Sequence, residues 1–160
     1  MSLTISPAVP SDIPLILSFI RKLAEYERLS HEAVATEADL HEHLFGSYPA
    51  AEVLIALLDN HPVGFALYFR TFSTFLGRPG IYLEDLFVDS ESRGRGVGKA
   101  LLTHLAALTF ERGYGRLEWS VLDWNQPSIA FYRSLGAIPL DNWTGYRLSG
   151  SALRNLAQTK

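Results

Sequence analysis

The sequence predicts one α/β domain whose mixed, largely antiparallel sheet is flanked by helices. Its 160 residues are enough for a single domain with a hydrophobic core, so residues 1–160 are expected to form one domain. Two short β-like segments follow each other across a turn, which predicts an antiparallel hairpin. A third β-like segment leads through a glycine-rich elbow and a helix into a fourth, and this crossover implies a parallel pair.

The first predicted elements are a short strand at residues 3–6 and an amphipathic helix. Apolar side chains recur at helical spacing between residues 13 and 24. Ser11 or Asp12 can cap the start of this helix. Pro14 fits its first turn, because the N–H that proline lacks would have no helical partner there.

A second, shorter helix is predicted from a capping signal, Thr36 followed three residues later by Asp39, and Gly46 can end it. His41 and His43 in this helix are two residues apart, so they do not share a helix face. Paired metal ligands on a helix are expected three or four residues apart. We therefore predict surface histidines and no metal site.

The central part of the chain is predicted to form three successive strands. The segments EVLIALL (residues 52–58) and PVGFALYFR (residues 62–70) are short and rich in β-favoured residues. Asp59-Asn60-His61-Pro62 separates them as a turn. A third strand is expected over residues 81–88, after turn signals that include Gly77 and Gly80.

The last third is predicted to alternate between helices and strands. A helix begins near Lys99 and ends before Gly113, which suits a left-handed C-terminal cap. RLEWSVL (residues 116–122) alternates as a strand, and a second helix starts at Pro127 and ends before Gly136. The expected order from the third strand onward is strand, helix, strand, helix, strand.

The composition of the chain excludes several classes of function. The formal net charge of −3 argues against binding to duplex nucleic acid, which favours a basic face. The chain has no cysteine, so a thiol nucleophile, disulfides and thiolate metal sites are excluded. The N-terminus shows no secretory signal pattern and no apolar run is long enough to cross a bilayer. We expect a cytoplasmic protein without membrane partners.

The elbow SRGRGVGK is the clearest chemical signal. It fails the P-loop pattern, because the first glycine would fall on Arg93 and the magnesium-binding hydroxyl on Ala100, and its glycine spacing also fails the dinucleotide fingerprint. Its glycines let backbone N–H groups approach an anion at a helix N-terminus, and basic side chains add positive charge. The residues concerned are Arg93, Gly94, Arg95, Gly96, Gly98 and Lys99.

This elbow resembles the acyl-CoA pyrophosphate loop of the GNAT superfamily of N-acetyltransferases. Arg93, Gly94 and Gly96 match the superfamily pattern, while Ser90 stands where it has Gln or Arg. The segments LAEYE, YLEDLFV, LDWNQPSIAFYRSLGA and GYRL resemble the diamine acetyltransferase branch, which includes spermidine/spermine and thialysine acetyltransferases. Polyamine-specific members tend to have an acidic residue where this chain has Thr144, which argues against long polyamines. Separately, the segment LDWNQ favours the thialysine-like members.

The resemblance implies a GNAT-like fold and acetyl-CoA as co-substrate. The backbone of one strand would pair with the pantetheine amides if that strand separates from its parallel neighbour, and the loop would hold the pyrophosphate. Asn125 and Ser128 would either hold the pantetheine arm or cap their helix. The implied cofactor-binding residues are Leu86, Phe87, Val88, Arg93, Gly94, Arg95, Gly96, Val97, Gly98, Lys99, Asn125, Ser128 and Tyr132.

Amine acetylation also needs two proton-handling groups. An ammonium must lose its proton before it attacks a thioester, and Glu84 is a carboxylate whose neighbours Leu83, Leu86 and Phe87 are expected to make its surroundings partly apolar. The resemblance assigns Glu84 as the base and Tyr132 as the proton donor to the leaving thiolate. It further implies an amine pocket of acidic and aromatic groups, which suit a cation: Tyr26, Glu27, Glu84, Asp85, Asp123 and Trp124.

We therefore expect an enzyme that transfers acetyl directly from acetyl-CoA to a primary amine of a small molecule, either a diamine, a polyamine or a thialysine-like amino acid. Two alternatives stay open at this point: an acetyltransferase for protein lysines or N-termini, and a non-catalytic acyl-CoA-binding regulatory module. A homodimer is expected from the resemblance. The apolar residues of YRLSGSALRNLA (residues 146–157) suit either a dimer interface or the core of one chain.

Overall fold

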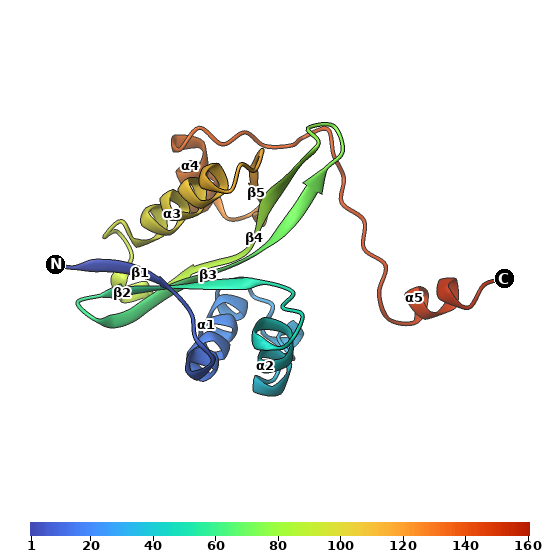
Figure 1. The fold of residues 1–160 in the computed structure, drawn as a ribbon, viewed down its shortest axis with the longest axis horizontal. Helices are drawn as coiled ribbons and strands as arrows, with labels where there is room; N and C mark the ends of the chain where they lie inside the picture. Colours follow the sequence, from blue (N-terminus) through green and yellow to red (C-terminus); the bar gives the residue numbers. More distant parts are fainter. The chain divides into compact units, whose positions relative to one another are not determined.

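The computed structural model describes residues 1–160, which form two compact units, Met1–Leu122 and Asp123–Lys160. The first unit contains the whole sheet and three of the α-helices (Figure 1). The second contains two short helices joined by irregular chain. No helix combines the length and the apolar character needed to cross a membrane.

The sheet of the first unit has five strands in sequential order: β1 (Leu3–Pro7), β2 (Glu52–Leu58), β3 (His61–Ser73), β4 (Arg78–Val88) and β5 (Leu117–Trp119). Neighbours from β1 to β4 are antiparallel, and β4 pairs with β5 in parallel. The predicted mixed, largely antiparallel sheet is confirmed. The strand expected over residues 116–122 is shorter, because its ladder to β4 contains only three residue pairs.

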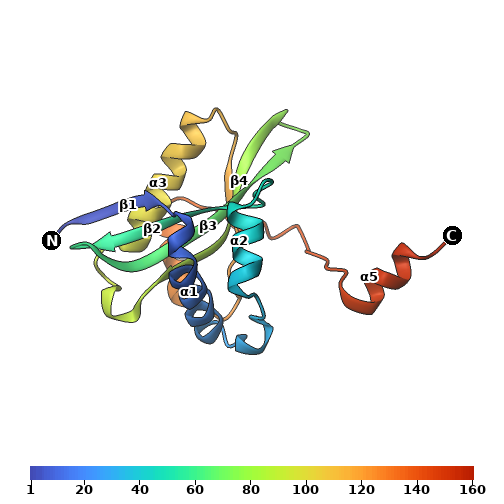
Figure 2. The same ribbon diagram turned by 60° about the horizontal axis from the view of Figure 1, so that its bottom comes forward.

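Helices cover both faces of this sheet. The helices α1 (Ile13–Tyr26) and α2 (Glu37–Phe45) lie on one face and α3 (Val97–Glu111) on the other, as the two views show (Figures 1 and 2). On the α1 side, the Phe19 ring stacks on Phe65 at 5.5 Å between centroids, and Phe87 follows at 6.1 Å. Both Phe19 and Phe65 are fully buried, so they anchor α1 to the middle of the sheet.

The β2–β3 connection is tighter than the four-residue turn predicted. Only Asp59 and Asn60 lie outside the strands, and both have positive φ, 49° and 66°. Two successive left-handed residues fit the right-handed twist of a two-residue hairpin, and Asp and Asn tolerate that conformation better than most residues. The hairpin itself is confirmed.

One predicted cap is confirmed and another is wrong. The Thr36 hydroxyl accepts a hydrogen bond from the Asp39 N–H at 3.2 Å, and the Asp39 carboxylate accepts one from the Thr36 N–H at 2.9 Å. Asp12 occupies the N-cap position of α1 but does not cap it. Its carboxylate accepts instead from the Val9 N–H at 2.8 Å, because a 3₁₀ turn, η1 (Pro10–Asp12), immediately precedes the helix.

The second unit begins with α4 (Gln126–Ser134), which has Pro127 in its first turn and a left-handed Gly136 after its end, as predicted. The strand expected after this helix is wrong. Residues 137–149 have no regular structure, and α5 (Gly150–Ala157) follows them. A strand needs a neighbour to complete its hydrogen bonds, whereas the helix α5 satisfies its own backbone.

Candidate functional site

The phosphate loop, residues 93–99, leads from β4 into α3 through a 3₁₀ turn, η3 (Ser90–Ser92). Gly94 and Gly96 have positive φ, 77° and 80°, and a Cβ at either position would meet nothing within 4 Å. Gly96 is the N-cap of α3 and offers no side chain to the first helical N–H groups. The N–H groups of this first turn lie at the positive end of a helix, and the space beside both glycines is open, which suits an anion such as a pyrophosphate. The helix begins at Val97, two residues before the predicted start.

The three basic residues of the loop differ in their surroundings. Arg95 and Lys99 are exposed and form no salt bridge. Arg93 lies against the end of α1, with its guanidinium carbon 4.8 Å from the centre of the Tyr26 ring. The loop thus keeps two cations available for an anion and commits the third to a protein contact.

A hollow of about 440 Å³ lies beside the loop, between α3 and β1. Gly96 and Lys99 belong to both the loop and the hollow, and Ile5, Thr103 and His104 contribute to its wall. No sequence motif indicates this hollow, because its wall combines β1 with a helix almost a hundred residues later in the chain.

Strands β4 and β5 separate just before the loop. They pair at Ile81, Tyr82 and Leu83 only, whereas β4 continues to pair with β3 as far as Val88. From Glu84 onward, the edge of β4 next to β5 is therefore not covered by a strand. This is the separation that the resemblance requires for backbone pairing with an extended amide-bearing ligand.

A β-bulge places Glu84 at the point of separation. Leu83 pairs with Tyr68 and Asp85 with Leu67, so Glu84 has no residue opposite it on β3. A bulge interrupts the strict alternation of side chains along a strand. As a result, two consecutive carboxylates come near Glu27, the residue that directly follows α1. We call Glu27, Glu84 and Asp85 the carboxylate cluster.

The cluster is electrostatically strained. Burial, and after it the charges of Glu84 and Glu27, together raise the pKa of Asp85 to about 7. The pKa of Glu27 is raised by burial and then by Glu84. A bound cation would offset the repulsion that contributes to the raised pKa values of Asp85 and Glu27.

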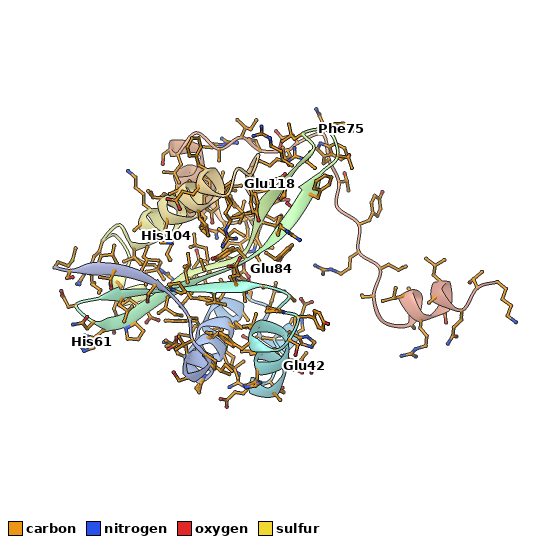
Figure 3. The ribbon with its side chains drawn as sticks, viewed as in Figure 1. Glu42, His61, Phe75, Glu84, His104 and Glu118 are labelled. Carbon is orange, nitrogen blue, oxygen red and sulfur yellow. The ribbon has the colours of Figure 1, made fainter.

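The expectation that apolar neighbours shield Glu84 is wrong. Glu84 is exposed, whereas Asp85 is half-buried. The bulge is the physical reason, because it shifts the alternation of side chains by one residue. Glu84 is labelled on β4 in Figure 3. The structure contains no group of three or more acidic or histidine side chains arranged to hold a metal.

The other predicted site residues lie in the second unit. Asn125 is the N-cap of α4, and its side-chain oxygen accepts from the Ser128 N–H at 3.4 Å. Of the two roles left open for Asn125, the cap is therefore formed. The ring of Tyr132 packs against Phe131, with 5.6 Å between centroids. Their roles toward substrates stay predictions, as do those of Asp123 and Trp124.

Two contacts that sequence analysis missed hold α1 and the sheet in place. Lys22 forms a salt bridge with Asp89 at 3.1 Å, which joins α1 to the residue before η3. Arg112 binds Glu52 with two hydrogen bonds of 2.9 and 3.0 Å, which joins the end of α3 to β2. The partners are 67 and 60 residues apart, so no local pattern could indicate them.

Comparison with known proteins agrees with this geometry. Residues 20–137 match the acetyltransferase (GNAT) family. A thialysine N-epsilon-acetyltransferase of Bos taurus is 37% identical over 164 residues, 96% of each chain. The L-ornithine N5-acetyltransferase of Arabidopsis thaliana is 33% identical over 92% of this chain and 84% of its own. A solved integron cassette protein from the mobile metagenome of V. cholerae has a TM-score of 0.84 at 29% identity, over 99% of both chains.

These matches cover the sheet, the phosphate loop and α4. The predicted enzyme class, an N-acetyltransferase, is confirmed, and so is the predicted fold. The family uses acetyl-CoA as its co-substrate. The chain belongs to the acetyltransferase (GNAT) family.

Proposed function

We propose that the protein transfers an acetyl group from acetyl-CoA directly to the primary amine of a small cationic molecule, a diamine or a basic amino acid of the thialysine or ornithine kind. The carboxylate cluster is the observation that carries this proposal. It places Glu27, Glu84 and Asp85 together where β4 leaves β5 and approaches the phosphate loop. The relatives named for thialysine and ornithine support the same substrate class.

The residues present suit acetyl-CoA. The free N–H groups around Gly94 and Gly96 would hold the pyrophosphate, with Arg95 and Lys99 adding charge. The uncovered edge of β4, residues 86–88, offers backbone groups to the pantetheine amides. When bound, acetyl-CoA supplies the thioester that the amine attacks. At the start of α4, Asn125 and Ser128 would orient the helix that carries Tyr132.

The cluster would bind the amine as an ammonium and then remove its proton. Glu84 is the proton acceptor, directly or through a water molecule, while Glu27 and Asp85 hold the positive charge. Asp85 is a second candidate for the acceptor, because its pKa of about 7 lies near the working pH of a general base. Tyr132 would donate a proton to the leaving thiolate. The family resemblance makes Tyr26, Asp123 and Trp124 further candidates for contacts with the amine.

We also propose that the enzyme acts in the cytoplasm as a homodimer. Support for the dimer is the apolar content of residues 146–157, which include Leu148, Leu153 and Leu156. Light scattering at enzyme concentrations from 1 to 100 times the assay concentration tests it. A constant mass of one chain would contradict the dimer.

The experiment that tests the proposed function is steady-state release of CoA from acetyl-CoA with a panel of amines. The panel contains thialysine, ornithine, lysine, putrescine, spermidine, spermine and a lysine peptide. Saturable turnover with a small amine supports the proposal and ranks the substrates. Preference for the peptide would favour a protein acetyltransferase, and tight CoA binding without any turnover would favour a regulatory module.

A further inference from the structure

Arg93 joins the phosphate loop to the end of α1. Its Nε donates a hydrogen bond to the Val88 carbonyl at 3.1 Å. Its guanidinium carbon lies 4.8 Å from the centre of the Tyr26 ring and 5.7 Å from that of Phe87. The guanidinium is therefore engaged by two aromatic rings and a strand-end carbonyl, a planar arrangement that favours arginine over lysine.

A second contact, the salt bridge between Lys22 and Asp89, also holds the end of α1 against the chain that follows β4. Lys22 and Tyr26 are four residues apart, so they lie on one face of α1. Lys22 forms a salt bridge with Asp89 at 3.1 Å, and Tyr26 contacts Arg93. Asp89 and Arg93 are likewise four residues apart. Both ties hold the last turn of α1 against the chain between β4 and the loop.

This last turn carries groups proposed to bind the amine. Tyr26 is its final residue, and Glu27 follows directly and belongs to the carboxylate cluster. Any change in the position of Tyr26 is transmitted through one peptide unit to Glu27. The contact between Arg93 and Tyr26 thus connects the anion-binding loop to the cation-binding cluster.

We propose that Arg93 is a positioning residue for the amine site, which holds Tyr26 and Glu27 in place from the phosphate loop, and that its own guanidinium does not bind the phosphates. The inference rests on the proposed function for the identity of the two sites. It separates the roles of the loop cations: Arg95 and Lys99 attract the anion, whereas Arg93 fixes α1. Arg93 was expected from the family resemblance to bind the cofactor.

The test compares Arg93→Lys and Arg93→Gln with Arg95→Gln as the matched control from the same loop. At saturating acetyl-CoA, we expect Arg93→Lys to raise the amine KM about tenfold, although the charge is kept, because the planar contact with Tyr26 is lost. Isothermal titration with CoA at low and high salt is the second readout. Arg93→Gln should keep the wild-type salt dependence of CoA affinity, and Arg95→Gln should reduce it.

A double-mutant cycle separates positioning from a general loss of stability. In a Tyr26→Leu background, Arg93→Lys should change the amine KM less than about twofold, because the contact is already absent. Each of three results would overturn the inference. The first is full additivity of the two substitutions, and the second is a wild-type amine KM in Arg93→Lys. The third is a loss of salt dependence in Arg93→Gln equal to that in Arg95→Gln. If the wild type acetylates no amine in the panel, the proposed function fails, and the CoA titrations still decide whether Arg93 binds phosphate.

Discussion

The phosphate loop and the carboxylate cluster are neighbours along β4, yet they are built in opposite ways. The loop consists of consecutive residues, and the groups proposed to bind the anion are backbone N–H donors around Gly94 and Gly96, which have positive φ. The cluster consists of side chains from α1 and β4, more than fifty residues apart, and it depends on one bulge. The first is a local property of the chain, and the second exists only in the folded sheet.

The loop and the cluster should also respond differently to substitutions and to pH. An anion site made of backbone tolerates changes of side chain but not of φ, because its donors must point outward. A cation site made of carboxylates tolerates small backbone shifts but responds to pH and to the removal of a single charge. Variants of each region should therefore fail in different measurements.

The largest expected effect is on proton transfer within the cluster. Glu84→Gln should lower kcat about a thousandfold, because the amide cannot accept a proton from the ammonium. Asp85→Asn should instead act mainly on the amine KM. The pH dependence of kcat and KM for both variants, with the preferred amine of the panel, distinguishes them. The reverse pattern would assign the proton acceptor to Asp85.

The CoA affinity of the phosphate loop should depend on its backbone conformation. Gly96→Ala should weaken CoA binding about a hundredfold, since an alanine disfavours a φ of +80° by about 1–2 kcal/mol and its methyl group enters the anion site. Isothermal titration with CoA measures this. Gly77→Ala is the matched control, because Gly77 has a φ of +65° in the β3–β4 turn and equally open space. A similar loss of affinity in both variants would show that strain alone is responsible.

The cluster should make stability depend on pH. The folded pKa of Asp85, about 7, lies above its usual value of 3.8, so between these values the folded state binds more protons than the unfolded state. The free energy of unfolding should therefore fall as pH rises from about 4 to about 7. Asp85→Asn should be more stable than wild type at pH 8 by on the order of 4 kcal/mol, and its stability should match that of the wild type below about pH 3. Urea unfolding across this range measures the difference, and parallel curves would contradict it.

The smallest expected effect is the loss of the salt bridge between Lys22 and Asp89, which holds α1 against the segment before the phosphate loop. Lys22→Met removes the salt bridge to Asp89, in which both side chains are partly exposed, and should lower the free energy of unfolding by about 0.5 kcal/mol. Arg21→Met, on the adjacent exposed position of α1 without a salt bridge, should have no comparable effect. Chemical denaturation at low and high salt checks this, because screening should abolish the difference between the variants.

Sequence reasoning succeeded where a few neighbouring residues decide the local structure. The Thr36 and Asp39 cap, the hairpin at Asp59 and Asn60 and the glycine elbow all follow from short-range sterics and hydrogen bonds. The crossover between β4 and β5 followed from connection rules, since a helix between two strands brings them into parallel register. It failed after α4, where the local pattern suggested a strand that lacks a neighbour to pair with.

What the sequence by itself determined is the proposed anion site: the glycines, the helix start and the basic residues are contiguous, so their geometry is local. Only the tertiary structure decided the proposed cation site and the proposed role of Arg93. The bulge at Glu84 comes from the register between β3 and β4, and Glu84 and Asp85 come near Glu27 only in the folded sheet. Arg93 turns to Tyr26 because α1 packs beside the end of β4. Register and packing arise from contacts between distant segments, which spacing along the chain does not encode.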